Sequence, residues 1–104
     1  RWVMHFHNTR DMALANIVTA IQAGIHVFDG AFAGLGGCPF APGATGNVAT
    51  EDVIHMLHEM GIDTGIDLLK AMDTARLAAK YVDHPPTSAV ITAGRCADLL
   101  RRID

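Results

Sequence analysis

Residues 2–28 read WVMHFHNTRDMALANIVTAIQAGIHVF, and this stretch decides the fold class. Its first six residues form an apolar-rich run that is typical of a short strand. Over residues 11–23 the apolar side chains recur at helical spacing, which predicts a helix that ends at Gly24. Residues 25–28 form a second short apolar run. A strand, a helix and a strand joined by this crossover predict a βαβ unit with parallel strands, so we expect an α/β fold.

Residues 31–46 contain five glycines and two prolines and are therefore predicted to be a loop for most of their length. Loops of this length inside compact domains are often functional. The rest of the chain is expected to hold helices over residues 51–60, 65–82 and 94–102. Thr50 and Thr64 precede the first two of these helices and are expected to begin them, and Glu51 and Asp52 suit the positive end of a helix dipole.

Composition and charge exclude several function classes. The chain has 104 residues, half of them hydrophobic, and a formal net charge of −3. No cluster of Lys and Arg predicts a nucleic-acid partner, and Gly and Pro interrupt the longest near-apolar stretch, so we expect no membrane span. The first residue is Arg1, already inside an apolar run, which suggests a part of a longer chain.

The two cysteines, Cys38 and Cys96, form no C-x-x-C pair, and the sequence does not exclude a disulfide between them. A zinc ribbon is therefore disfavoured. With no other secretory sign, two such cysteines favour reduced thiols and a cytosol-like compartment.

His5 and His7 are a candidate metal pair. Residues two apart on a strand point to the same face, so both imidazoles would converge at the carboxyl end of the strand, where parallel α/β folds place their active sites. The alternative is a chance pair, because the chain contains six histidines. The other four are not expected to be ligands: His26, His55, His58 and His84. His55 and His58 share a helical spacing that could bind a metal, but a solvated helix face is the favoured interpretation.

Two further residues in or beside the glycine-rich loop carry candidate chemistry. Cys38 lies between Gly-Gly and Pro, and a thiol with an ordinary pKa of about 8.5 needs only a modest shift to exchange a proton near neutrality. A buried structural thiol is the alternative. Asn47 stands just before a predicted helix, where its amide oxygen could cap the helix or bind a hard cation. From the residues alone, capping is favoured.

Together these segments resemble one family. Residues 5–9 (HFHNT), 12–16 (MALAN), 33–40 (AGLGGCPF) and 44–52 (ATGNVATED) occur in this order in 3-hydroxy-3-methylglutaryl-CoA lyases. The H-x-H pair is shared with the wider metal-dependent barrel lyases and synthases, whereas the cysteine loop separates this sequence from isopropylmalate and homocitrate synthases. Where this family often has His-Asp-Thr-Tyr-Gly, this chain has HNTRD over residues 7–11.

The resemblance implies that residues 1–104 are the C-terminal portion of a (β/α)₈ TIM barrel, about strands 6 to 8 with their helices. It implies that His5, His7 and Asn47 bind Mg²⁺ or Mn²⁺, that Cys38 is the catalytic thiol, and that a further Asp ligand lies upstream. The implied reaction is retro-Claisen cleavage of an acyl-CoA thioester to acetyl-CoA and acetoacetate.

Several alternatives stay open beside that reaction. The chain could be a non-catalytic fragment that keeps part of the metal site, or a part of a lyase for another 3-hydroxy acyl-CoA. An incomplete barrel is expected to form a homo-oligomer or to need the N-terminal half. The expected location is the cytoplasm, or the mitochondrial matrix if the source is eukaryotic.

Overall fold

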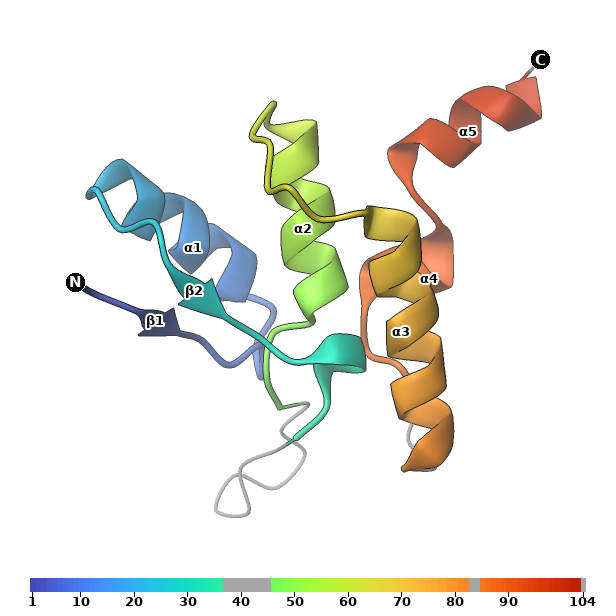
Figure 1. Cartoon of the computed structure of the whole chain (residues 1–104), viewed down its shortest axis with the longest axis horizontal. Coiled ribbons are helices and arrows are strands. Elements are labelled where there is room, and N and C mark those ends of the chain that lie inside the picture. The colour runs from blue at the N-terminus through green and yellow to red at the C-terminus, as the bar shows by residue number, and fades with distance from the viewer. Residues whose placement is uncertain (37–45, 83–84, 104) are drawn as a thin grey trace.

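The computed structural model describes residues 1–36, 46–82 and 85–103. A parallel strand pair lies on one side of the molecule and α2 lies in the middle. On the other side α3 packs beside α4 (Figure 1). The elements in chain order are β1 (Met4–His5), α1 (Ala13–Gln22), β2 (Phe28–Asp29), the 3₁₀ turn η1 (Phe32–Gly34), α2 (Thr50–Glu59), α3 (Leu68–Tyr81), α4 (Ala89–Ala93) and α5 (Cys96–Ile103).

The predicted βαβ unit is confirmed. β1 and β2 pair in parallel, with Met4 opposite Phe28 and His5 opposite Asp29. Both strands are shorter than the predicted runs, because regular pairing extends over only two residues of each. Residues 46–49 continue the pairing through single bridges, since Asn47 pairs with His7 and Ala49 pairs with Ala31. The carboxyl ends of β1 and β2 therefore meet the segment that precedes α2.

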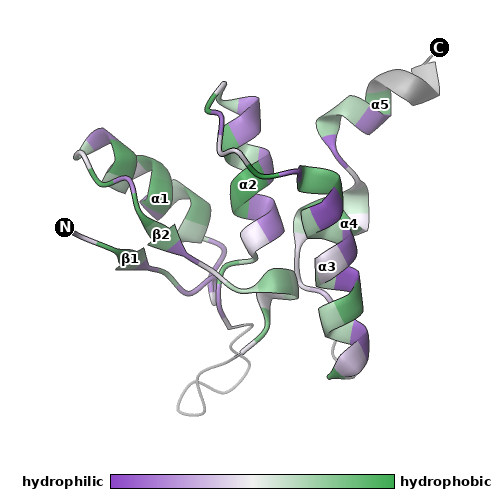
Figure 2. Ribbon diagram, in the orientation of Figure 1, coloured by the Kyte–Doolittle hydropathy of each residue, from purple (hydrophilic) through white to green (hydrophobic). Residues whose placement is uncertain are grey.

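The main hydrophobic core lies between the strand pair, α1 and α2. Ile17 and Ala13 are fully buried on the inner face of α1, and they pack against Val48 and Val53. The helical spacing of apolar residues that predicted α1 is therefore the spacing that fills this core, and α1 is largely hydrophobic in Figure 2. Gly24 follows the helix with a φ of +92°, and its N–H bonds the Ile21 carbonyl, so the predicted helix end is confirmed.

The prediction that Thr50 caps α2 is wrong. The N-cap residue is Ala49, whose side chain makes no capping hydrogen bond, and Thr50 is the first helical residue. The physical reason is strand pairing. Ala49 is still extended and bridged to Ala31, and the Thr50 N–H donates to the Ala31 carbonyl at 3.0 Å.

The prediction that Thr64 begins the next helix is also wrong. α3 starts at Leu68, and Asp67 caps it by accepting a hydrogen bond from the Lys70 N–H at 3.1 Å. The Thr64 hydroxyl instead lies 2.7 Å from His58 Nε2 and accepts from the Ile66 N–H. Thr64 therefore closes a turn between α2 and α3.

We expect Asp67→Ala to lower the free energy of unfolding by about 1 kcal/mol, because the exposed N-terminus of α3 loses its side-chain acceptor. Asp73→Ala is the matched control. Asp73 is an exposed carboxylate on the same helix whose ion pair with Arg76 should contribute at most about 0.5 kcal/mol. Urea denaturation of both variants measures the difference. Equal losses would show that the cap is not what stabilises α3.

Gly94 lies between the last two helices, α4 and α5. α5 confirms the expected last helix, but α4 was not predicted. Asp52 holds α4 in place, because its carboxylate accepts from the N–H groups of Ala89 and Val90 at 3.0 and 2.8 Å. Gly94 has a φ of +83° and ends α4 before α5 begins. Within the described part of the chain, no helix is both long and apolar enough to cross a membrane.

Candidate metal centre

The two histidines of the H-x-H pair lie together at the carboxyl end of β1. Their ring centroids are 5.1 Å apart and the rings meet edge to face at 72°. Both residues are exposed to solvent. The i, i+2 spacing therefore places both imidazoles on one accessible side of the strand end.

Asp29 fixes the orientation of His5. The pairing register puts Asp29 directly opposite His5, and its Oδ1 lies 2.5 Å from His5 Nδ1. A carboxylate can only accept a hydrogen bond, so Nδ1 carries the proton and donates it. Nε2 is then the ring nitrogen left with a lone pair. Metal-binding histidines commonly have this second carboxylate contact. Asp29 could not be selected from the residues alone, because the register of two short strands is not predictable.

Asn47 does not cap α2, so the capping interpretation is wrong. Its amide nitrogen donates to the Leu35 carbonyl at 2.9 Å, and its backbone forms the bridge with His7. The contact with Leu35 turns the amide so that Oδ1 faces away from that carbonyl. The backbone of Asn47 is therefore held beside His7. Its side-chain oxygen is of a type that can bind a hard cation.

The segment that contains Cys38 starts and ends beside Asn47. Cys38 itself lies outside the described residues, as do all of residues 37–45. On either side of them, Gly36 and Gly46 are close: the Asn47 N–H bonds the Gly36 carbonyl at 3.3 Å. A Cβ on Gly46 would come within 1.4 Å of the Gly36 oxygen, and its φ is +91°. Only glycine can occupy this position without moving the backbone.

Glu51 holds the turn that precedes the glycine-rich segment in place. Its side chain is fully buried in the first turn of α2, and both carboxylate oxygens lie 3.0 Å from the Ala33 N–H. Ala33 has a φ of +60°, which is costly for a residue with a Cβ. Glu51 was expected only to complement the helix dipole. The structure shows that it also ties η1, the turn leading towards residue 37, to α2.

The residues at which this chain departs from the family pattern form the turn after β1. Asp11 has a φ of +61°, a conformation that glycine adopts at lower cost. Asn8 accepts a hydrogen bond from the Ala13 N–H at 3.2 Å, at the start of α1. The side-chain oxygen of Asn8 is therefore used to begin α1.

The other described histidines lie away from this pair, and two of them are less solvated than expected. His58 contacts Thr64. His55 is only 20% exposed in its side chain and accepts a hydrogen bond from the Cys96 N–H at 3.2 Å. The prediction of a simple solvated face is wrong because α5 and the turn after α2 cover these positions. His84 lies outside the described residues.

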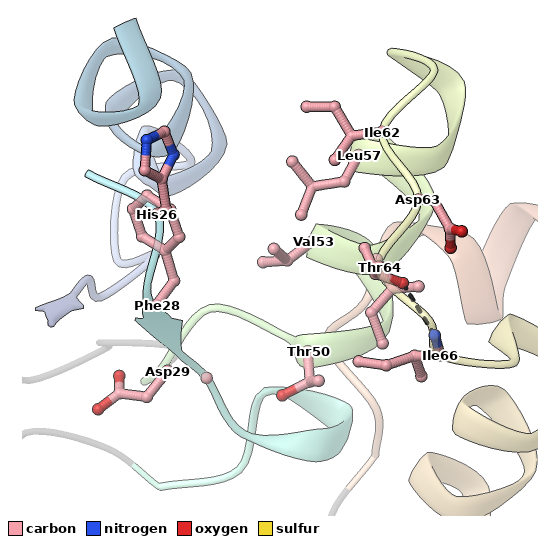
Figure 3. Close-up of a pocket in the computed structure, with 12 residues that line it drawn as sticks. His26, Phe28, Asp29, Thr50, Val53, Leu57, Ile62, Asp63, Thr64 and Ile66 are labelled. Atoms are coloured by element: carbon pink, nitrogen blue, oxygen red, sulfur yellow. Dashed lines mark hydrogen bonds between the residues drawn. The ribbon is translucent and has the colours of Figure 1, made fainter. Parts of the chain in front are cut away.

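A hollow of about 370 Å³ opens between β2 and α2. Figure 3 shows His26 and Phe28 on one wall and the aliphatic side chains of α2 and the following turn on the other. Asp29 also lines it, although its carboxylate is bonded to His5. The hollow is mainly apolar and does not include His5, His7 or Asn47. It is therefore a neighbouring surface and not the candidate metal centre itself.

A parallel βαβ unit with polar candidate site residues at the carboxyl end of a strand is typical of α/β barrel enzymes. The chain belongs to the HMGL-like family, whose model matches residues 1–78. It is 53% identical over 90 residues to a cytoplasmic 3-hydroxy-3-methylglutaryl-CoA lyase of Mus musculus, covering 86% of this chain and 26% of that relative. It is 52% identical over 82 residues to the hydroxymethylglutaryl-CoA lyase YngG of Bacillus subtilis, covering 79% of this chain and 27% of that relative.

Solved structures agree with these sequence matches. A lyase from Acinetobacter baumannii, in complex with coenzyme A and 3-methylmalate, has a TM-score of 0.83 and 46% identity. The match covers 92% of this chain and 32% of that one. A hydroxymethylglutaryl-CoA lyase from Pseudomonas aeruginosa also has a TM-score of 0.83, at 42% identity, over 96% of this chain and 32% of that one. These neighbours are TIM barrels. The chain thus spans roughly a quarter to a third of the length of the relatives it matches.

Proposed function

We propose that this chain supplies part of the active site of a carbon–carbon lyase that cleaves 3-hydroxy-3-methylglutaryl-CoA to acetyl-CoA and acetoacetate. One observation carries the proposal beyond family membership. His5 is held by Asp29 with Nε2 left as a ligand, while His7 lies beside it and is bridged to Asn47. These are the three residues that the family pattern assigns to the metal.

The donor set fits a hard divalent cation. Two imidazole nitrogens and one amide oxygen leave room for further oxygen ligands, which suits six-coordinate Mg²⁺ or Mn²⁺. We propose that His5 Nε2, a ring nitrogen of His7 and Asn47 Oδ1 hold this ion. When bound, the ion would act as a Lewis acid towards the substrate's hydroxyl and carbonyl oxygens.

The remaining chemistry is proton transfer. A base removes the proton from the tertiary hydroxyl, the C–C bond breaks, acetoacetate leaves, and the acetyl-CoA enolate takes up a proton. We propose Cys38 as an acid or base in these reaction steps. The segment that contains Cys38 lies between Gly36 and Gly46, and both of these glycines lie beside Asn47. Glu51 has a positioning role, because it holds the Ala33 backbone that precedes this segment.

We further propose that the described elements are about strands 6 to 8 of a TIM barrel with their helices. Trp2 and Val3, just before β1, are 77% and 56% exposed. In a closed barrel the neighbouring strand would cover such residues, so we expect this edge to meet the N-terminal half of the barrel or a second copy. The relatives include cytoplasmic and mitochondrial lyases, and we propose a cytoplasmic location, or the mitochondrial matrix if the source is eukaryotic.

Segment exchange tests the proposed function directly. The chain would replace the aligned segment of the full-length Bacillus subtilis relative, and acetyl-CoA release would be measured with Mg²⁺. We expect the chimera to cleave 3-hydroxy-3-methylglutaryl-CoA and a His7→Ala chimera to lose this activity. A folded chimera without turnover would favour the alternative of a non-catalytic remnant. Turnover of another 3-hydroxy acyl-CoA instead would redefine the substrate.

A further inference from the structure

A group of side chains of the types that can bind a metal lies on the side of α2 that faces α5. His55 and Glu59 occupy neighbouring turns of α2, and Cys96 is the first residue of α5. One ligand atom from each of these residues lies within 4.8 Å of the other two. Within the residues that the structure describes, this is the group in which three such donors converge.

The distances are close to those of a bound metal. His55 Nε2 lies 3.6 Å from Glu59 Oε1. Bond lengths of 2.0–2.3 Å in a tetrahedral zinc site place neighbouring ligand atoms roughly 3.3–3.8 Å apart. The histidine and the glutamate therefore already have a suitable separation. The thiol needs a shift on the order of 1 Å, which an exposed side chain can make by changing its rotamer.

The hydrogen bonding and the charge around the group also suit a metal. His55 Nε2 accepts the Cys96 N–H at 3.2 Å, so this nitrogen carries a lone pair. An incoming ion would take over that lone pair, and the exposed Cys96 N–H could bond to water instead. Cys96 is the first residue of an eight-residue helix, so the positive end of the helix dipole lies beside its side chain. Arg95 precedes it, and hydrogen bonding to Asp98 raises the pKa of Arg95, so a positive charge stays nearby.

We infer that His55, Glu59 and Cys96 form a second metal site, which takes a thiol-binding divalent cation such as Zn²⁺ and fastens α5 to α2. A thiolate, an imidazole and a carboxylate, with water as the fourth ligand, form a donor set for zinc and not for Mg²⁺. This site is separate from the proposed lyase centre, whose donors are imidazole nitrogens and an amide oxygen. Its existence does not depend on the lyase reaction.

Titration of the whole chain with Co²⁺ tests this inference, because Co²⁺ reports a thiolate ligand through a charge-transfer absorption band. We expect the band to reach the intensity of one thiolate-bound Co²⁺ per chain, to disappear when Zn²⁺ is added and to persist in excess Mg²⁺. Cys96→Ser should abolish the band. His55→Ala should weaken Co²⁺ binding at least about tenfold, the lower limit for losing even an indirect contact to a metal.

Three control variants separate this site from other binding. His58→Ala removes a histidine from the same helix whose ring nitrogen contacts Thr64, and it should leave the band unchanged. Cys38→Ser and His5→Ala should also keep the band. Circular dichroism would confirm that Cys96→Ser is folded, which we expect because Cys96 is exposed. A missing band in the unaltered chain, or a band that survives Cys96→Ser, would overturn the inference.

Discussion

His5→Ala is expected to weaken Mn²⁺ binding by at least about 100-fold, because it removes a direct ligand, and loss of an outer contact alone costs about 10- to 100-fold. The proposed role of His5 explains the size of this loss. Asp29 fixes the imidazole so that Nε2 carries the lone pair, and no described neighbour on β1 can replace it at the same place. Titration followed by the electron paramagnetic resonance of free Mn²⁺ measures the affinity.

Two further variants make this prediction specific. Asp29→Asn keeps the shape of the side chain but removes its charge, and it should weaken Mn²⁺ binding by about 10- to 100-fold. His26→Ala removes an exposed histidine just before β2 and should change the affinity less than twofold. If His5→Ala bound Mn²⁺ as tightly as the unaltered chain, the proposed metal centre would be wrong.

Glu51→Ala is expected to lower the free energy of unfolding by about 3 kcal/mol. The variant leaves the buried Ala33 N–H without its carboxylate acceptor, which costs about 1–3 kcal/mol, and it leaves a cavity in place of a fully buried side chain. Ala33 also has a positive φ that this contact helps to hold. Urea denaturation followed by circular dichroism measures the loss.

Glu51→Gln is the matched variant for this test. A glutamine keeps an oxygen acceptor and nearly the same volume, so we expect a loss of about 1 kcal/mol. If Glu51→Ala were within about 0.5 kcal/mol of the unaltered chain, the buried carboxylate would not be what holds η1 to α2.

Helix periodicity and the order of apolar runs were sufficient to predict the βαβ unit. α1 follows its pattern because Ile17 and Ala13 fill the core that lies under the strand pair. Helix starts were less predictable, since Thr50 and Thr64 both looked like caps. Strand pairing at Ala49 and a turn closed by Thr64 decided otherwise. Such tertiary contacts override local preference, and no local pattern indicates them.

In the candidate site, too, some residues could be predicted from the sequence and others could not. The H-x-H spacing predicted that His5 and His7 would lie on one side of a strand, and their rings are close together. The supporting residues were not predictable, because Asp29 reaches His5 only through the register of β1 and β2. Glu51 reaches Ala33 only because the chain returns after the glycine-rich segment. Local sequence therefore indicates ligands more readily than the residues that orient them.

A crystal structure of the chain soaked with Mn²⁺, with anomalous data collected near the manganese absorption edge, would locate the ion relative to His5, His7 and Asn47. We expect one strong anomalous peak within about 2.0–2.3 Å of His5 Nε2, a His7 ring nitrogen and Asn47 Oδ1. The same crystals of His5→Ala should lack this peak. Manganese bound elsewhere, with the space between these three side chains empty, would show that the proposed metal centre is wrong.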